Sequence, residues 1–173
     1  MLIAPVSLRL LLVRHGLSSF NLEHRIQGRD ALSSLTEQGA AQAHATGEAL
    51  RELPLTAAYS SPLRRAHDTA TTLLAAHGGG LTTQLDDDLL EVDLAPWSGM
   101  LSSEVRERFP EEQRLWRQHP EQLELQRADG SRYLPIPELL AQADRFAARL
   151  LAAHDPRSPE PQTVRSEEHT SEL

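Results

Sequence analysis

A short apolar run that ends abruptly in charged residues constrains the fold of this chain more than any other feature. Residues 8–13 are almost uncharged and far too few to span a bilayer. A run of this length is typical of a strand that is buried on both faces of a parallel sheet. Arg14, His15 and Gly16 follow at its carboxyl end, where open α/β sheets bind their ligands. Gly16 would let the backbone turn closely around a bound group.

The residues at this strand end have the chemistry of a phosphate site. The Arg14 guanidinium offers fork-shaped donors for phosphate oxygens, and the His15 imidazole can attack phosphorus or relay protons. The alternative is a histidine that pairs with surface carboxylates, and these two residues alone fit it equally well. The rest of the chain decides between the two interpretations.

Composition limits the class of protein. With 173 residues, 39% hydrophobic and 24% charged, the chain has the size and make-up of one globular domain. Its net charge of -8 argues against non-specific nucleic-acid binding. The absence of cysteine excludes disulfides and thiolate metal sites. Since no targeting or membrane-spanning stretch is evident, we expect a cytoplasmic protein with no membrane partner.

A second junction between a strand and a helix repeats the arginine signal. Thr36 is a typical N-cap for an alanine-rich helix that ends before Pro54. Residues 55–60 predict another buried strand, and Pro62 lies near the first turn of the helix that follows. Arg64 and Arg65 stand in that turn, where a helix N-terminus already favours anions.

Acidic residues occur in two different settings further along the chain. The run Asp86–Asp88 predicts a solvated acidic turn. A metal site is the less favoured interpretation, because no further ligands lie at a suitable spacing in the sequence. Glu91 lies inside an apolar segment, where burial would raise its pKa and let it donate a proton at neutral pH. Residues 102–108, 111–118 and 137–153 predict helices, and residues 122–135 an irregular surface excursion.

Taken together, these motifs resemble the histidine phosphatase superfamily, which has the phosphoglycerate mutase-like fold. The resemblance runs from about residue 10 to residue 164 and depends on the order and spacing of several segments. These segments are Leu12–Gly16, Asn21, Gln27–Gly28, Leu35–Ala43, Ser60–Ala66 with Thr69–Ala70, and Leu90–Glu91. The resemblance implies an α/β three-layer sandwich with a mostly parallel central sheet flanked by helices.

The resemblance also implies roles for the matching residues. His15 would be the nucleophile that forms a phosphohistidine, and a backbone acceptor on its other ring nitrogen would set its tautomer. Arg14 and Arg65 would hold the phosphoryl oxygens, and Glu91 would protonate the leaving alkoxide. The substrate-binding residues would be Arg14, Ser18, Asn21, Gln27, Gly28 and Arg65. No metal or cofactor is needed in this scheme.

Several positions depart from the family pattern. Leu17 stands where the family often has Glu or Gln, and Ala95–Gly99 replaces an acidic Trp-Glu-Gly segment. The Gly-Glu-Ser that usually precedes the last long helix is replaced by Pro135–Glu138. These differences predict an altered substrate pocket.

The carboxyl-terminal residues depart from the family most of all. The family follows its last long helix with a buried strand that ends in a second catalytic histidine, and then with further helix. Gln162–Val164 resembles the entry to that strand, but residues 165–173 read RSEEHTSEL. Unpaired charges are too costly for the interior of a two-sided strand. The same residues match the in-frame translation of a widely used sequencing adapter.

We therefore expect a histidine phosphatase domain over residues 1–164, incomplete at its C-terminus, and a non-native tail over residues 165–173. His169 falls about where the second histidine would lie, but its lead-in is polar and we expect a coincidence. The sheet would then lack its carboxyl-terminal strand and the helix behind it, and the chain as written would have impaired activity.

The sequence predicts a phosphomonoester hydrolase that acts through a phosphohistidine on a small phosphorylated substrate. A cofactor-dependent mutase of the phosphoglycerate type is the alternative within the family. A non-catalytic phospho-ligand binder is the alternative from another class, although binding alone needs neither His15 nor Glu91.

Overall fold

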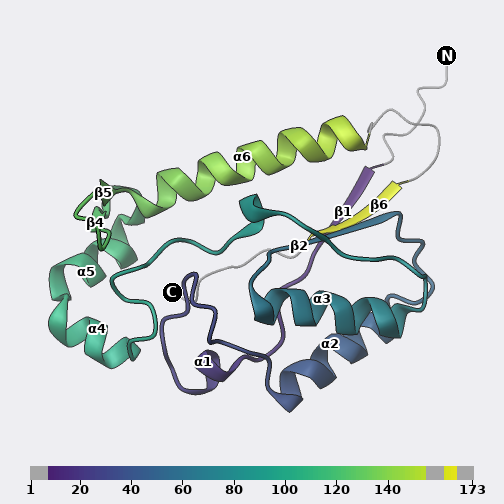
Figure 1. The fold of residues 1–173 in the computed structure, drawn as a ribbon, viewed down its shortest axis with the longest axis horizontal. Coiled ribbons are helices and arrows are strands. Elements are labelled where there is room, and N and C mark those ends of the chain that lie inside the picture. Colours follow the sequence, from purple (N-terminus) through teal and green to yellow (C-terminus); the bar gives the residue numbers. More distant parts are fainter. Residues whose placement is uncertain (1–7, 155–161, 167–173) are drawn as a thin grey trace.

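The structure, a computed structural model, describes residues 8–154 and 162–166. These residues contain a four-stranded sheet whose pairs are all parallel, in the order β1-β6-β2-β3. The strands are β1 (Leu8–Leu12), β2 (Ala57–Ser60), β3 (Gln84–Leu85) and β6 (Gln162–Ser166). Helices α2 (Glu37–Ala49) and α3 (Arg64–His77) cover one face of the sheet, and α6 (Pro135–Ala153) covers the other (Figure 1). The predicted three-layer α/β sandwich is confirmed.

The two helices on one face begin and end at residues suited to those positions. Thr36 caps α2, and its Oγ1 accepts a hydrogen bond of 3.0 Å from the Gly39 amide. Helix α3 ends at Gly78, whose φ of 78° suits a residue without a side chain. The helices pack closely, because a Cβ on Gly47 would lie 2.3 Å from the Leu73 carbonyl oxygen.

A smaller part of the molecule extends beyond the sheet, around the end of α6 that carries its first turn (Figure 1). Its elements are α4 (Ser102–Arg108), α5 (Pro110–Gln118), the 3₁₀ turn η2 (Pro120–Gln122), and strands β4 (Leu125–Gln126) and β5 (Arg132–Tyr133). The strands β4 and β5 pair antiparallel, so the excursion expected to be irregular contains a hairpin. The buried core here comprises Val92, Leu94, Trp97, Val105, Trp116, Leu123, Leu125 and Tyr133.

Strand β1 is less buried than its composition predicts. Leu10 is 42% exposed and Leu12 is 57% exposed, so the expectation of a strand buried on both faces is wrong. The reason is position: β1 is at the edge of the sheet, and its one strand partner among the described residues is β6. An apolar run shows which residues can be buried. The elements that pack against the strand determine which of those residues are in fact buried.

Strand β6 corrects the expectation that the sheet lacks its carboxyl-terminal strand. It pairs with β1 on one side and β2 on the other, and its pairing includes residues 165 and 166. Backbone hydrogen bonds to a neighbour on each side stabilise a central strand independently of its side chains. In β6, Thr163 and Val164 are buried in the core. Residues 167–173 of the predicted tail, His169 among them, lie outside the described residues.

The acidic turn is not the solvated feature that the sequence suggests. Asp86 caps the 3₁₀ turn η1 (Asp87–Leu89), and Asp86 and Asp88 both contact α6. Arg149 contacts Asp86 at 2.6 Å and Asp88 at 2.7 Å, and Arg145 also contacts Asp88. Ion pairs of these carboxylates therefore connect α6 to the segment that precedes Glu91. No helix within the described ranges is long and apolar enough to cross a membrane.

Candidate active site

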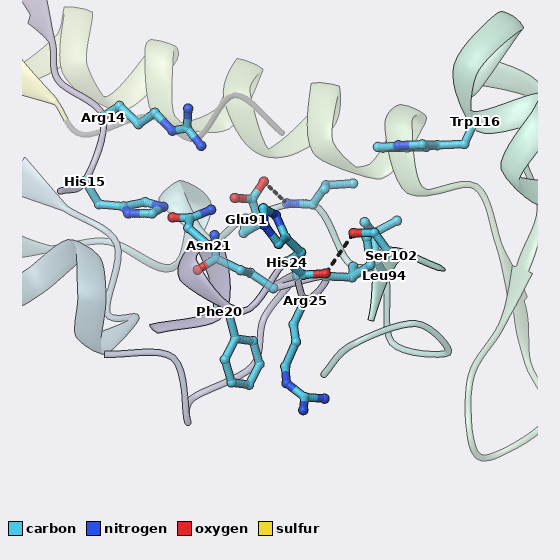
Figure 2. Close-up of a pocket in the computed structure, with 14 residues that line it drawn as sticks. Arg14, His15, Phe20, Asn21, His24, Arg25, Glu91, Leu94, Ser102 and Trp116 are labelled. Carbon is cyan, nitrogen blue, oxygen red and sulfur yellow. Dashed lines mark hydrogen bonds between the residues drawn. The ribbon is translucent and has the colours of Figure 1, made fainter. Parts of the chain in front are cut away.

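A cleft opens beyond the carboxyl end of β1, where Arg14 and His15 stand. It holds about 650 Å³ of space, including its open mouth. Its lining comprises Arg14, His15, Phe20, Asn21, His24, Arg25, Ile26, Gln27, Gly28, Glu91, Val92, Leu94, Ser102 and Trp116. Arg14 and His15 lie at one end of the cleft and Trp116 at the other, with Glu91 between them (Figure 2). The parallel sheet thus brings a histidine, an arginine and a carboxyl group to one place.

A backbone carbonyl group orients the imidazole ring of His15. The side chain is buried, and its Nδ1 lies 2.7 Å from the carbonyl oxygen of Gly16. Because a carbonyl oxygen can only accept, Nδ1 carries the proton in this contact and Nε2 of the neutral ring carries the lone pair. The expectation that a backbone acceptor sets the tautomer of His15 is confirmed.

The turn at Gly16 requires a glycine for steric reasons. A Cβ on Gly16 would lie 2.2 Å from the carbonyl oxygen of Gly39, at the start of α2. The Gly16 amide donates to Thr69 Oγ1 at 3.1 Å, and that hydroxyl donates to the Arg65 carbonyl at 2.7 Å. The loop after β1 is therefore fixed against both α2 and α3.

Arg65 is fully buried in the first turn of α3, and its side chain connects two segments of the site. Its guanidinium donates to the carbonyl oxygens of Gly28 at 2.8 Å and Asp30 at 3.2 Å. Its Nη2 also lies 4.0 Å from Glu91 Oε2. Arg65 thus connects the loop after β1 with the acidic segment, whereas Arg14 is exposed and forms part of the cleft wall.

Glu91 has the environment of a proton donor. It is 7% exposed, and burial raises the pKa of its carboxyl group above the usual range. The Val92 amide, which donates to Glu91 Oε1 at 3.2 Å, and the charges of Arg65, Arg14 and Arg29 oppose this rise in pKa. The raised pKa predicted from the apolar sequence is confirmed in direction.

Ser18 is one of the predicted substrate-binding residues, but it does not line the cleft. It is fully buried as the N-cap of α1 (Ser19–Leu22). Its hydroxyl lies 2.9 Å from Asn21 Oδ1 and 2.7 Å from Gln27 Oε1 and can donate to one of them at a time. Ser18 therefore orients two amides that do line the cleft.

Gly28 also lines the cleft, and its φ of 46° is one that side chains rarely adopt. The structure thus brings together His15, Arg14, Asn21, Gln27, Gly28 and Glu91 at the cleft, with Arg65 behind it and Ser18 beneath the loop. Within the described ranges, no group of three His, Asp or Glu side chains could hold a metal ion.

Sequence reasoning missed two residues that contact the backbone of the acidic segment. Arg29 donates from Nε to the Glu91 carbonyl at 2.9 Å, and Gln142 donates to the Leu90 carbonyl at 3.2 Å. Gln142 lies on α6, more than a hundred positions away from Arg29. No local pattern could have linked these two residues, because a tertiary contact brings them together.

Comparisons with known proteins agree with this geometry. The family model of the histidine phosphatase superfamily (branch 1) matches residues 10–158. The probable 2-carboxy-D-arabinitol-1-phosphatase of Arabidopsis thaliana is 33% identical over 150 residues, which cover 87% of this chain and 30% of that protein. Phosphoserine phosphatase 1 of Hydrogenobacter thermophilus is 38% identical over 118 residues, which cover 68% of this chain and 54% of that protein. The chain therefore spans about a third to a half of the length of these curated relatives.

A solved structure supports the same relationship at the level of the fold. Bacillus stearothermophilus YhfR superposes with a TM-score of 0.82 and 28% identity, covering 94% of this chain and 74% of that chain. The family match covers most of the sequence, and it includes the strand end, the loop that follows it and the acidic segment, all of which line the cleft. This chain belongs to the histidine phosphatase superfamily.

Proposed function

We propose that this chain hydrolyses phosphomonoesters through a phosphohistidine on His15. In the first step the Nε2 lone pair of His15 attacks phosphorus and the P–O bond to the alcohol breaks. Glu91 then gives its carboxyl proton to the departing alkoxide. Arg14, which lines the cleft, holds the phosphoryl oxygens while charge moves during in-line transfer. Arg65, buried behind the cleft, adds its positive charge and holds the carbonyl groups of Gly28 and Asp30 in place.

The second step returns the enzyme to its starting state. Water attacks phosphorus, the carboxylate of Glu91 takes a proton from that water, and the P–N bond to His15 breaks. Inorganic phosphate leaves, and Glu91 is protonated again for the next cycle. Asn21 and Gln27 donate hydrogen bonds to the phosphate or the ester oxygen from the amides that Ser18 orients.

One observation carries the proposal. The contact of His15 Nδ1 with the Gly16 carbonyl leaves the lone pair on the ring nitrogen that would attack phosphorus. The substrate we propose is a small phosphorylated molecule, and the names of the two curated relatives place their own substrates in that class.

The test is turnover of 4-nitrophenyl phosphate by the wild type and by His15→Ala. We expect His15→Ala to lower kcat by about a thousandfold or more, since the nucleophile is lost. The matched control is His44→Ala, on the exposed face of α2, which should retain wild-type turnover. Mass spectrometry of acid-quenched and base-quenched enzyme should detect an acid-labile phosphohistidine at residue 15.

Other results would contradict the proposal and indicate which alternative holds. Turnover that requires a bisphosphate primer would indicate phosphotransfer of the mutase type. Binding of phosphate esters without turnover, unchanged in His15→Ala, would indicate a non-catalytic binder. Wild-type turnover that survives the loss of His15 would exclude the phosphohistidine.

A further inference from the structure

We propose that Arg29 and Gln142 are positioning residues, which hold the backbone of Leu90 and Glu91 so that the Glu91 carboxyl meets the leaving-group oxygen. This inference rests on the proposed hydrolysis. It adds helix α6, which the cleft lining does not include, to the parts of the chain that serve proton transfer.

The segment that carries Glu91 has no regular secondary structure to hold it. Residues 90–94 follow the 3₁₀ turn η1 and lie outside every helix and strand. The carbonyl oxygens of Leu90 and Glu91 accept hydrogen bonds from side chains, those of Gln142 and Arg29. Buried carbonyl groups need partners, so these two side chains set where the backbone of the general acid lies.

The two side chains form a connected unit. Arg29 donates from Nη2 to Gln142 Oε1, and from Nε to the Glu91 carbonyl at 2.9 Å. Gln142 is 7% exposed, and its Nε2 donates to the Leu90 carbonyl at 3.2 Å. A guanidinium can only donate and a carbonyl can only accept, so one orientation of the Gln142 amide satisfies both contacts. A primary amide meets this need, whereas a carboxylate at the same position lacks the donor.

Arg29 adds a charge to this geometry. The cationic groups near Glu91 are Arg65 from α3, Arg14 from the end of β1, and Arg29 from the loop that follows Gly28. His15 faces the same cleft. All three arginines lower the pKa of Glu91 against the effect of burial. Removal of the Arg29 charge should therefore move the pKa of Glu91 upward, whereas Arg29→Lys should leave it nearly in place.

The decisive experiment compares two substrates of nearly the same shape, phenyl phosphate and 4-nitrophenyl phosphate. The phenolate needs a proton to leave, and the 4-nitrophenolate needs it much less. For Gln142→Glu and Arg29→Lys we expect kcat on phenyl phosphate to fall about tenfold to a hundredfold, the range that misplacement of a catalytic group produces. On 4-nitrophenyl phosphate we expect the loss to stay below about threefold, with KM unchanged for both substrates.

Phe146→Leu is the matched control, because Phe146 lies one turn beyond Gln142 on α6 and packs against Tyr59 instead of the acidic segment. It should lower stability and reduce turnover of the two substrates by the same factor. Arg29→Gln should in addition move the alkaline limb of kcat for phenyl phosphate to higher pH, a change that loss of packing alone would not cause.

Each outcome bears on one proposal. Equal losses on both substrates, or wild-type kinetics in Gln142→Glu and Arg29→Lys, would overturn the positioning role. Absence of wild-type turnover on either substrate would overturn the proposed hydrolysis instead. Should Gln142→Glu fail to fold, judged by circular dichroism, Arg29→Lys carries the same comparison.

Discussion

At the scale of single residues, the candidate site depends on where two protons are held. The Gly16 carbonyl accepts the Nδ1 proton of His15, and burial favours the protonated carboxyl of Glu91. Neither arrangement needs a metal ion. Both depend on neighbours that contribute a backbone carbonyl or a dry environment, which general composition does not encode.

Glu91→Gln tests the acid at this scale. Glutamine keeps the shape of the side chain but cannot transfer a proton, so we expect kcat on phenyl phosphate to fall about a hundredfold to a thousandfold. Wild-type kcat should decline as pH rises through the raised pKa of Glu91, because the proton-donating form is lost. The variant should lack this decline.

The control for Glu91→Gln is the same substitution at Glu52, which is exposed and outside the cleft. It should retain the wild-type pH profile. A Glu91→Gln enzyme with the wild-type alkaline limb would show that another group supplies the proton.

At the scale of elements, close approach and ion pairs position the loops that carry the site. The start of α2 contacts the turn after β1 through two glycines, Gly16 and Gly39. Helix α6 is fastened to the segment before Glu91 by Asp86 and Asp88. These contacts position His15 and Glu91 from opposite faces of the sheet.

Gly39→Ala tests the contact between α2 and the turn. The added Cβ would lie 2.2 Å from the Leu17 carbonyl oxygen, so backbone must move apart at the strand end that carries His15. We expect a loss of about 1–3 kcal/mol in the free energy of unfolding, measured by urea denaturation, together with reduced turnover. Gln38→Ala, at the exposed neighbouring position, should change neither quantity appreciably. Wild-type stability of Gly39→Ala would mean that the two segments are not in contact.

Asp88→Asn tests the ion pairs between α6 and the 3₁₀ turn η1. Its hydrogen bond with Arg145 is the largest cause that lowers the pKa of Asp88 in the folded protein, and the contact with Arg149 adds to it. At neutral pH we expect the variant to lose about 1 kcal/mol of stability, as for a small ion-pair network. A carboxylate whose pKa is lowered on folding stabilises the folded protein at pH values above its pKa in the unfolded chain, about 3.9. This stabilisation is lost as the pH falls through the pKa of the folded protein.

The measurement for Asp88→Asn is urea denaturation across this pH range. The difference from the wild type should shrink as the medium becomes acidic, and Asp87→Asn, at an exposed neighbour, should show no such difference. A loss that persists unchanged in acid would contradict the ionic origin of the contact.

At the scale of the whole molecule, β6 joins the two halves of the site. The strand that leads to His15 and the strand that leads to Arg65 do not pair with each other, because β6 lies between them. Val164 is fully buried and packs with Ala57, Phe146 and Leu150. The distance between His15 and Arg65 therefore depends on β6, a strand far away from both residues in the sequence.

Val164→Ala tests this central role. Removing two methyl groups from a fully buried position should cost about 2–3 kcal/mol in the free energy of unfolding. Leu12→Ala, at an exposed position of β1, should cost about 0.5 kcal/mol or less. Equal losses in the two variants, measured by urea denaturation, would contradict the central burial of β6.

Local sequence patterns predicted the long helices and several of the residues that line the cleft. Spacing and capping residues identified α2, α3, α4, α5 and α6, because helix periodicity and N-caps are local properties. The apolar segment around Glu91 was enough to predict the direction of its pKa change. Of the predicted site residues, His15, Arg14, Asn21, Gln27, Gly28 and Glu91 line the cleft, whereas Ser18 and Arg65 do not, and their roles stay predictions.

Packing between the elements sets which side chains are buried and which partners they contact. The exposure of Leu10 and Leu12 follows from the edge position of β1, and β6 enters the sheet despite the polar residues at its end. The hydrogen bonds of Ser18 with Gln27 and of Gln142 with the Leu90 carbonyl group form between residues that are separated in the sequence. Burial and hydrogen-bond partners arise from how the elements pack, and no local window of sequence contains that information.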